Sequence, residues 1–179
     1  MPAQFKIFFR ALEENDLERT HRWHNDPDLY STLGDSFRFV SRTAEAEWLR
    51  RKSGYTPDEV NLAICLQTRA EHIGNAYLRE INWVVRKASL HIFVGSKEYR
   101  GKGYGKQVVQ LLLRHAFLDL NLNRVGLEVL ADNEQAIRLY ERVGFRTEGR
   151  LRSHVCKEGR FKDVLVMGIL RAEFKTTER

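Results

Sequence analysis

Cysteine is scarce in this sequence. Cys65 and Cys156 are the only two among 179 residues, and they form no CxxC pair. A zinc site with the usual ligand spacing is therefore not expected, and sparse cysteine is typical of proteins of the reducing cytosol. The six histidines show no ligand spacing on one element, and His21 and His24 are predicted to lie on the surface. We expect a cytoplasmic protein without a bound metal.

Long apolar segments and linkers are missing as well. No stretch has the apolar length of a membrane-spanning helix, and residues 1–16 lack the apolar core of a signal peptide. The chain has only three prolines, no internal repeat and no linker rich in proline, glycine or serine. The sequence therefore predicts one domain, residues 1–179, and no membrane partner.

Charge of one sign is not concentrated anywhere in the chain. The net charge is +6, from 30 basic and 24 acidic residues that are spread throughout. A basic chain can bind an anionic partner. No helix-turn-helix, RNP or zinc-finger pattern is present, however, so we expect no nucleic-acid partner.

The hydrophobic pattern predicts alternating strands and helices. Strands are expected at residues 5–12, 59–67, 72–84, 87–95, 124–130, 145–159 and 160–174. Helices are expected at residues 13–26, 41–54, 104–122 and 132–144. Residues 27–39 are predicted to form an irregular loop with exposed aromatic side chains. This order is mixed α/β, with a strand–helix–strand crossover at its centre.

A turn rich in glycine and cations lies between the fourth of these strands and the long helix. The stretch EYRGKGYGKQ contains Gly101, Gly103 and Gly105 together with Arg100, Lys102 and Lys106. A helix N-terminus has unpaired N–H groups that bind anions, and glycine lets the backbone approach a ligand. The stretch therefore suits a pyrophosphate, although a plain surface loop explains it equally well.

Two familiar nucleotide-binding patterns do not fit this turn. A P-loop requires GxxxxGK[ST], but Gly103 follows Lys102 where that pattern has Ser or Thr. A dinucleotide fingerprint requires GxGxxG, and Lys106 occupies the place of its third glycine. ATPase, kinase and Rossmann oxidoreductase functions are therefore disfavoured.

A second group of polar residues follows about 30 positions later. Asn133 and Tyr140 are seven residues apart on a predicted helix, so they share a face at a separation of about 10 Å. Glu128 lies on the strand before that helix. A parallel crossover would bring all three to the glycine turn, because ligands of such sheets bind near the carboxyl ends of strands. Taken singly, these residues are equally explained as a helix cap, a surface tyrosine and a solvated glutamate.

Together the two stretches resemble the GCN5-related N-acetyltransferase (GNAT) superfamily. Arg100-Gly101-Lys102-Gly103-Tyr104-Gly105 matches its Arg/Gln-x-x-Gly-x-Gly/Ala signature, and DNEQAIRLYERVGF matches its second block at Asn133, Ala136, Tyr140, Gly144 and Phe145. The chain looks similar to the ribosomal-protein and spermidine acetyltransferase branches. The resemblance implies an α/β fold with a mixed, mostly antiparallel sheet of about seven strands, a central parallel pair and about four helices.

The resemblance also implies a role for each candidate residue. The turn from Arg100 to Lys106 (Arg100, Gly101, Lys102, Gly103, Tyr104, Gly105, Lys106) would hold the pyrophosphate of acetyl-CoA. The backbone of Phe93 and Val94, together with Asn133, would contact the pantetheine arm. Tyr140 would be the general acid for the departing thiolate. Glu128 is the favoured general base; Glu80 would line the substrate site, and a water chain could replace either glutamate.

The implied activity is transfer of an acetyl group from acetyl-CoA to a primary amine, either of a small molecule or at a protein N-terminus. A non-catalytic CoA-binding module on the same fold is the alternative function. Members of the family are often dimers, so the resemblance also implies a possible homodimer. Residues 29–39 hold Asp35 as their only carboxylate, together with Arg38. The spermidine enzymes have an acidic pair in this region, so the sequence disfavours a polyamine acceptor and leaves small amines, amino sugars, aminoglycoside-like compounds and peptide N-termini open.

Overall fold

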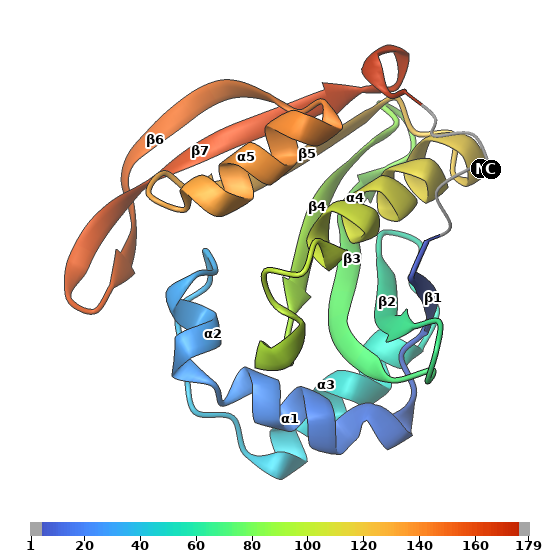
Figure 1. Ribbon diagram of the computed structural model, residues 1–179, viewed down its shortest axis with the longest axis vertical. Helices are drawn as coiled ribbons and strands as arrows, with labels where there is room; N and C mark the ends of the chain where they lie inside the picture. The colour runs from blue at the N-terminus through green and yellow to red at the C-terminus, as the bar shows by residue number, and fades with distance from the viewer. Residues whose placement is uncertain (1–4, 176–179) are drawn as a thin grey trace.

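A central seven-stranded sheet organises the computed structural model, which describes residues 5–175 (Figure 1). The strands are β1 (Ile7–Ala11), β2 (Val60–Leu66), β3 (His72–Asn82), β4 (Lys87–Val94), β5 (Arg124–Leu130), β6 (Arg146–Lys157) and β7 (Arg160–Leu170). Their spatial order is β1-β2-β3-β4-β5-β7-β6. β4 and β5 are parallel, and all other neighbouring pairs are antiparallel. The expected mixed sheet with one central parallel pair is confirmed.

Five α-helices accompany the sheet within this described part of the chain. They are α1 (Leu17–His24), α2 (Pro27–Ser31), α3 (Arg42–Ser53), α4 (Tyr104–Arg114) and α5 (Glu134–Val143). A π-helical turn, His115–Asp119, continues α4. No helix among residues 5–175 combines the length and the apolar character that are required to cross a membrane.

The short helix α2 was not expected from the sequence, which predicted a loop over residues 27–39. Asp26 caps it, because the Asp26 side chain accepts a hydrogen bond from the backbone N–H of Asp28 at 3.0 Å. Pro27 occupies the first helical turn, where its missing N–H costs no hydrogen bond. The prediction of an irregular loop was therefore wrong for residues 27–31. Exposed aromatics are confirmed at Phe39, which is 90% exposed.

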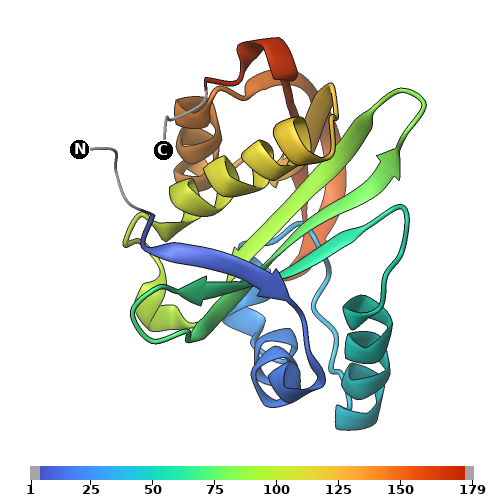
Figure 2. The same cartoon turned by 90° about the vertical axis from the view of Figure 1, so that its right-hand side faces the viewer.

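The two faces of the sheet carry separate apolar clusters. α4 and its π-helical turn bury Leu112 and Phe117 against strand residues such as Leu78 on one face. On the other face, which α1 and α3 cover, Leu49 and Cys65 belong to a smaller buried cluster. Figure 2 shows α4 on one side of the strands and α1 and α3 on the opposite side.

The parallel pair β4–β5 stays together over only three residue pairs. Lys87 pairs with Arg124, Ala88 with Val125 and Ser89 with Gly126. Beyond these pairs β5 continues beside β7, and β4 continues beside β3. The two strands therefore diverge, and residues 90–94 of β4 have no strand partner on the edge that faces β5.

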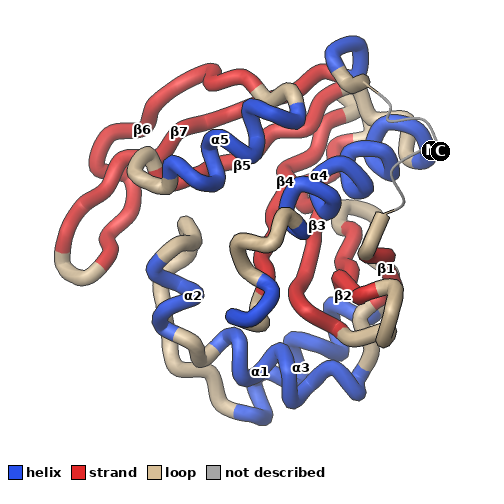
Figure 3. The backbone as a smooth tube through the Cα atoms, viewed as in Figure 1, coloured by secondary structure: helices blue, strands red, loops and turns tan. Residues whose placement is uncertain are grey.

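The connection from β4 to α4 reaches back to α2. Figure 3 shows this tan and blue segment opposite α2, on the open side of the sheet. Lys97 donates a hydrogen bond to the carboxylate of Asp28 at 2.6 Å, and Arg100 lies 3.4 Å from the carboxylate of Asp26. Two ion pairs thus tie the start of α2 to the glycine turn.

Candidate functional site

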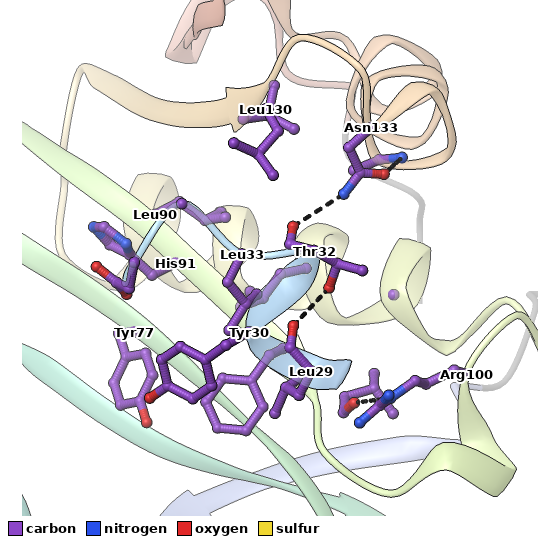
Figure 4. A pocket seen from close by; sticks show the side chains of 18 of the residues that line it. Leu29, Tyr30, Thr32, Leu33, Tyr77, Leu90, His91, Arg100, Leu130 and Asn133 are labelled. Carbon is purple, nitrogen blue, oxygen red and sulfur yellow. Dashed lines mark hydrogen bonds between the residues drawn. The ribbon is translucent and has the colours of Figure 1, made fainter. Parts of the chain in front are cut away.

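A cavity of about 900 Å³ opens where β4 and β5 diverge. One side, which we call the glycine-turn side, is formed by the turn before α4, by β5 and by α5. The other, the α2–α3 side, is formed by α1, α2, α3 and β3. Residues 90–94 of β4 run between the two sides. In the view of Figure 4, Tyr30, Tyr77 and His91 gather at one end of the cavity, and Arg100 lies at the other.

The glycine turn has the backbone shape that an anion cradle needs. Gly101 and Gly103 have φ angles of +73° and +82°, a region that L-residues with side chains avoid. A Cβ atom built on either glycine would meet nothing within 4 Å. Glycine is therefore required here by the backbone conformation and not by crowding. Gly103 is the N-cap residue of α4, which leaves the first N–H groups of that helix unpaired.

The three cations of this turn, Arg100, Lys102 and Lys106, have different surroundings. Lys106 lines the cavity, whereas Lys102 and Tyr104 do not. The ammonium of Lys102 lies 5.7 Å from the centre of the Tyr99 ring. The Arg100 guanidinium donates to the carbonyls of Val94 at 2.9 Å and Gly95 at 2.6 Å.

The contacts of Arg100 clamp the end of β4 to the glycine turn. Together with the neighbouring Asp26, they direct its charge toward protein acceptors. Arg100 therefore shapes the turn, and a direct phosphate contact from it stays a prediction.

Four further predicted residues reach the same cavity from β4, β5 and α5. Phe93, Val94, Glu128 and Asn133 line it together with Gly101, Gly103, Gly105 and Lys106. Asn133 caps α5, because its Oδ1 accepts from the N–H of Ala136 at 3.1 Å, and its Nδ2 donates to the carbonyl of Thr32 at 3.2 Å. The helix-cap interpretation of Asn133 is thus confirmed. The side chain of Glu128 is 55% exposed and lies 3.8 Å from His154.

Tyr140 lines the cavity from α5 and packs against Phe145, with the ring centres 5.7 Å apart. Burial raises the pKa of Tyr140 to about 12, so its hydroxyl keeps its proton at neutral pH.

Glu80, unlike Tyr140 and Glu128, lies away from the cavity. It is exposed, has a φ of +54° where β3 and β4 shift register, and does not line the cavity. The expected substrate-lining position of Glu80 therefore stays a prediction that the lining of this cavity does not support.

A buried pair on the α2–α3 side was not expected from the sequence. His24 was expected on the surface, but its side chain is 13% exposed and its Nδ1 lies 2.7 Å from Oε2 of Glu45. The ring of Trp48 packs edge-on against His24 at 4.7 Å. Glu45 itself is 1% exposed, and its second oxygen, Oε1, has no hydrogen-bond partner. In sequence, Glu45 looks like an ordinary glutamate in the first turn of a helix.

An unpartnered buried carboxylate oxygen is costly unless a ligand satisfies it. Leaving such an acceptor without a donor costs about 1–3 kcal/mol, and more for a charged group. Glu45 lines the cavity together with the aromatic rings of Tyr30 and Trp48. A carboxylate beside aromatic faces is the chemistry that binds an ammonium group.

Two neighbouring strand residues complete the α2–α3 side. Tyr77 on β3 and His91 on β4 are directly paired in the sheet. Burial lowers the pKa of His91, and the charge of Arg79 lowers it further, so the imidazole is neutral at neutral pH. The hydroxyl of Tyr77 accepts a hydrogen bond from Asn75 at 2.7 Å. Periodicity alone gave no reason to single out either residue.

Comparison with known proteins places these features in a family. The family model described as an acetyltransferase (GNAT) domain matches residues 6–146. Spermidine N(1)-acetyltransferase of Vibrio cholerae serotype O1 is 30% identical over 169 residues, which cover 94% of this chain and 95% of that relative. The same enzyme of Escherichia coli K12 is 28% identical over 174 residues, 97% and 91% of the two chains.

A solved structure shares the architecture as well. It is a crystal structure of spermidine N-acetyltransferase from Vibrio cholerae in complex with CoA and spermine. The TM-score is 0.88 at 29% identity, and the match covers 95% of this chain and 98% of that chain.

The glycine turn yields a first prediction, which concerns anion binding alone. Gly103→Ala should weaken the binding of inorganic pyrophosphate about tenfold, because a side chain at this φ costs roughly 1–2 kcal/mol and displaces the start of α4. Isothermal titration measures the effect. Gly149→Ala is the control, since Gly149 also has open space around it but no positive φ. Equal affinities for the two variants would show that the turn is an ordinary loop.

Proposed function

The chain belongs to the GNAT acetyltransferase family, and we propose that its cavity acetylates a small primary amine whose ammonium group is bound by Glu45. The protein is an N-acetyltransferase that uses acetyl-CoA as the donor. The observation that carries the acceptor proposal is the buried, unpartnered Oε1 of Glu45, a residue that lines the cavity.

The glycine-turn side fits the donor. The open N–H groups at Gly103 and the charge of Lys106 suit the pyrophosphate of acetyl-CoA, because both favour anions. The edge of β4 that faces β5 has no strand partner at Phe93 and Val94, and its backbone groups other than the Val94 carbonyl, which accepts from Arg100, are available to the two amides of the pantetheine arm. For Asn133 to contact that arm, its Nδ2 would exchange the Thr32 carbonyl for the ligand.

The α2–α3 side fits the acceptor. An ammonium at Oε1 of Glu45 would satisfy the orphaned oxygen, and the Tyr30 and Trp48 rings provide faces for cation–π contact. His24 holds the other oxygen in place, so the carboxylate is preorganised. Binding at Glu45 desolvates the amine and directs it toward β4.

A polyamine is one acceptor class that the relatives support, since both relatives described above are spermidine acetyltransferases. Glu45 and Asp35 could each meet one ammonium group of such a chain. Arg51 and Arg79 line the same side, however, and their charges oppose a polycation. We therefore propose a small primary amine with few positive charges, and use spermidine as a reference acceptor.

The reaction needs a base, because only a neutral amine attacks a thioester. We propose His91 for this role in place of Glu128. The lowered pKa of His91 keeps the imidazole neutral, and it lies two residues beyond the last β4–β5 pair, where the cavity begins. Glu128 is mostly exposed and faces His154. His91 takes one proton from the bound ammonium, the neutral amine nitrogen then bonds to the acetyl carbon, the C–S bond breaks to release the thiolate, and the second proton of the nitrogen passes to solvent.

Tyr140 faces the negative charge that develops on sulfur. The phenol of Tyr140 has a pKa of about 12, whereas a thiol has a pKa of about 8.5. Full proton transfer from the phenol to the thiolate would therefore cost about 5 kcal/mol. A hydrogen bond from the hydroxyl to the sulfur stabilises the departing thiolate without that cost. We therefore propose Tyr140 as a hydrogen-bond donor, and the thiolate takes its proton from water after release.

Replacing Glu45 tests the acceptor site. Glu45→Gln should raise KM for butylamine and for spermidine about tenfold or more, because an ion-paired hydrogen bond becomes a neutral one. The affinity for acetyl-CoA should stay unchanged. Glu47→Gln, on the exposed face of the same helix, is the matched control. Release of free thiol from acetyl-CoA measures turnover.

Two results would count against these assignments. An unaltered KM in Glu45→Gln would remove the ammonium site. Tight acetyl-CoA binding without thiol release for any amine would favour the non-catalytic module.

Replacing Tyr140 tests the thiolate contact. Tyr140→Phe should lower kcat about a hundredfold while the dissociation constant of acetyl-CoA changes little, because the lost hydrogen bond forms mainly in the transition state. Steady-state kinetics and equilibrium titration separate the two effects. Wild-type turnover in this variant would rule out the assigned role.

The pH dependence of turnover distinguishes the two candidate bases. Because the pKa of His91 is lowered from its ordinary value, kcat should be constant around neutral pH and decline only in acid, where His91 becomes protonated. His91→Gln should lose this acidic limb and about a hundredfold in kcat. Glu128→Gln should keep the limb; if it is Glu128→Gln that abolishes the limb, Glu128 is the base.

A further inference from the structure

Arg79 is a cation without an anionic partner on the α2–α3 side of the cavity. It lies on β3, and its guanidinium sits over the Tyr77 ring, 4.7 Å from the ring centre. Among the described residues, no carboxylate forms an ion pair with it. Its Nε is buried and has no hydrogen-bond partner. The guanidinium thus lies over the Tyr77 ring without a carboxylate in ion-pair contact and with its Nε unpartnered.

The charges of Arg79 and Glu45 both influence the pKa of the Tyr30 and Tyr77 hydroxyl groups. Burial raises the pKa of Tyr30 and of Tyr77; the charge of Glu45 raises both further, and the charge of Arg79 opposes the rise. The two opposite charges therefore both lie within reach of Tyr30 and Tyr77. The α2–α3 side of the cavity accordingly has a negative pole at Glu45 and a positive pole at Arg79.

Burial raises the pKa of Glu59, but its ion-pair partner Lys52 and, to a smaller degree, Arg79 lower it, so Glu59 lies near Arg79 with its carboxylate already paired to Lys52. Asp35 and Arg51 also line this side, and Asp35 is not within ion-pair distance of Arg79. His91 is kept neutral by its lowered pKa. A partly buried guanidinium with an unpaired donor is costly, and an anion is the ligand that satisfies it.

We propose that the acceptor is an amphoteric molecule: a primary amine that also carries a carboxylate or a phosphate, which Arg79 binds. This inference rests on the proposed function, since the amine is the group that Glu45 holds. The planar guanidinium presents parallel N–H donors that match either oxyanion. The class differs from the polycations named for the relatives, because a second ammonium group would be placed near Arg79.

A matched set of acceptors tests the proposal. The set contains pentylamine, 1,5-diaminopentane, 5-aminopentanoate and 3-aminopropyl phosphate, which place no charge, a positive charge, a carboxylate or a phosphate at the far end. Thiol release from acetyl-CoA gives kcat/KM for each. In the wild-type protein we expect kcat/KM for at least one of the two anionic acceptors to exceed that for pentylamine about tenfold or more. Comparing kcat/KM for 5-aminopentanoate with that for 3-aminopropyl phosphate shows whether Arg79 prefers a carboxylate or a phosphate.

Arg79→Gln carries the decisive comparison. Its preference for the anionic acceptor over pentylamine should fall to about twofold or less, and its preference for 1,5-diaminopentane should rise. Arg50→Gln, an exposed arginine outside this cavity, should keep the wild-type ranking. An unchanged affinity for acetyl-CoA shows that Arg79→Gln is folded. If the variant does not fold, the ranking of the four acceptors by the wild-type protein alone tests the proposal.

The failures of the two proposals are distinguishable. If amines are acetylated without preference for the anionic acceptors, or if 1,5-diaminopentane is best, the amphoteric class is overturned and the amine function stands. If acetyl-CoA binds and no acceptor in the set is acetylated, the proposed amine function fails and the amphoteric class fails with it.

Discussion

The divergence of β4 and β5 is the constraint on which the rest of this molecule depends. Three parallel residue pairs, ending at Ser89 and Gly126, hold the strands together, and each strand then follows a different neighbour. Residues 91–94 of this edge are partly buried and line the cavity, and the Val94 carbonyl accepts a hydrogen bond from Arg100; an extended ligand would supply partners for the other backbone groups of the edge. The extended amide chain of acetyl-CoA is such a ligand. The same divergence brings the glycine turn and α5 to one cavity.

The acceptor side has a different physical basis, because it is made of side chains and not of backbone edges. α1, α2 and α3 cover the far face of β3 and β4 and enclose Glu45, His24 and Arg79 in partly buried surroundings. Burial strengthens each electrostatic interaction and makes each unsatisfied group more expensive. The unpartnered oxygen of Glu45 and the unpaired donor of Arg79 therefore carry more information about the acceptor than exposed charges such as Glu128.

Hydrophobic periodicity and turn chemistry were sufficient for most of the fold. Alternating apolar residues marked the strands, and Gly103 and Gly144 marked the start of α4 and the end of α5. Helix α2 was missed because the pattern over residues 27–31 is too short to show helical spacing, and Asp26 before Pro27 also signals the end of a helix. The glycine turn and the residues Asn133 and Tyr140 were found because local motifs with fixed spacing carry them.

The sequence by itself determined the order of the strands and of every helix except α2, the position of the glycine turn and the family to which the chain belongs, since each depends on residues close together along the chain. Only the tertiary structure decided which isolated polar residues share a cavity. It leaves Glu80 exposed at a register shift and outside the lining of the cavity, and it places His24, His91 and Arg79 in that lining. Burial, and with it the pKa and the cost of an unpaired charge, is a property of packing between distant segments, so no local pattern could report it.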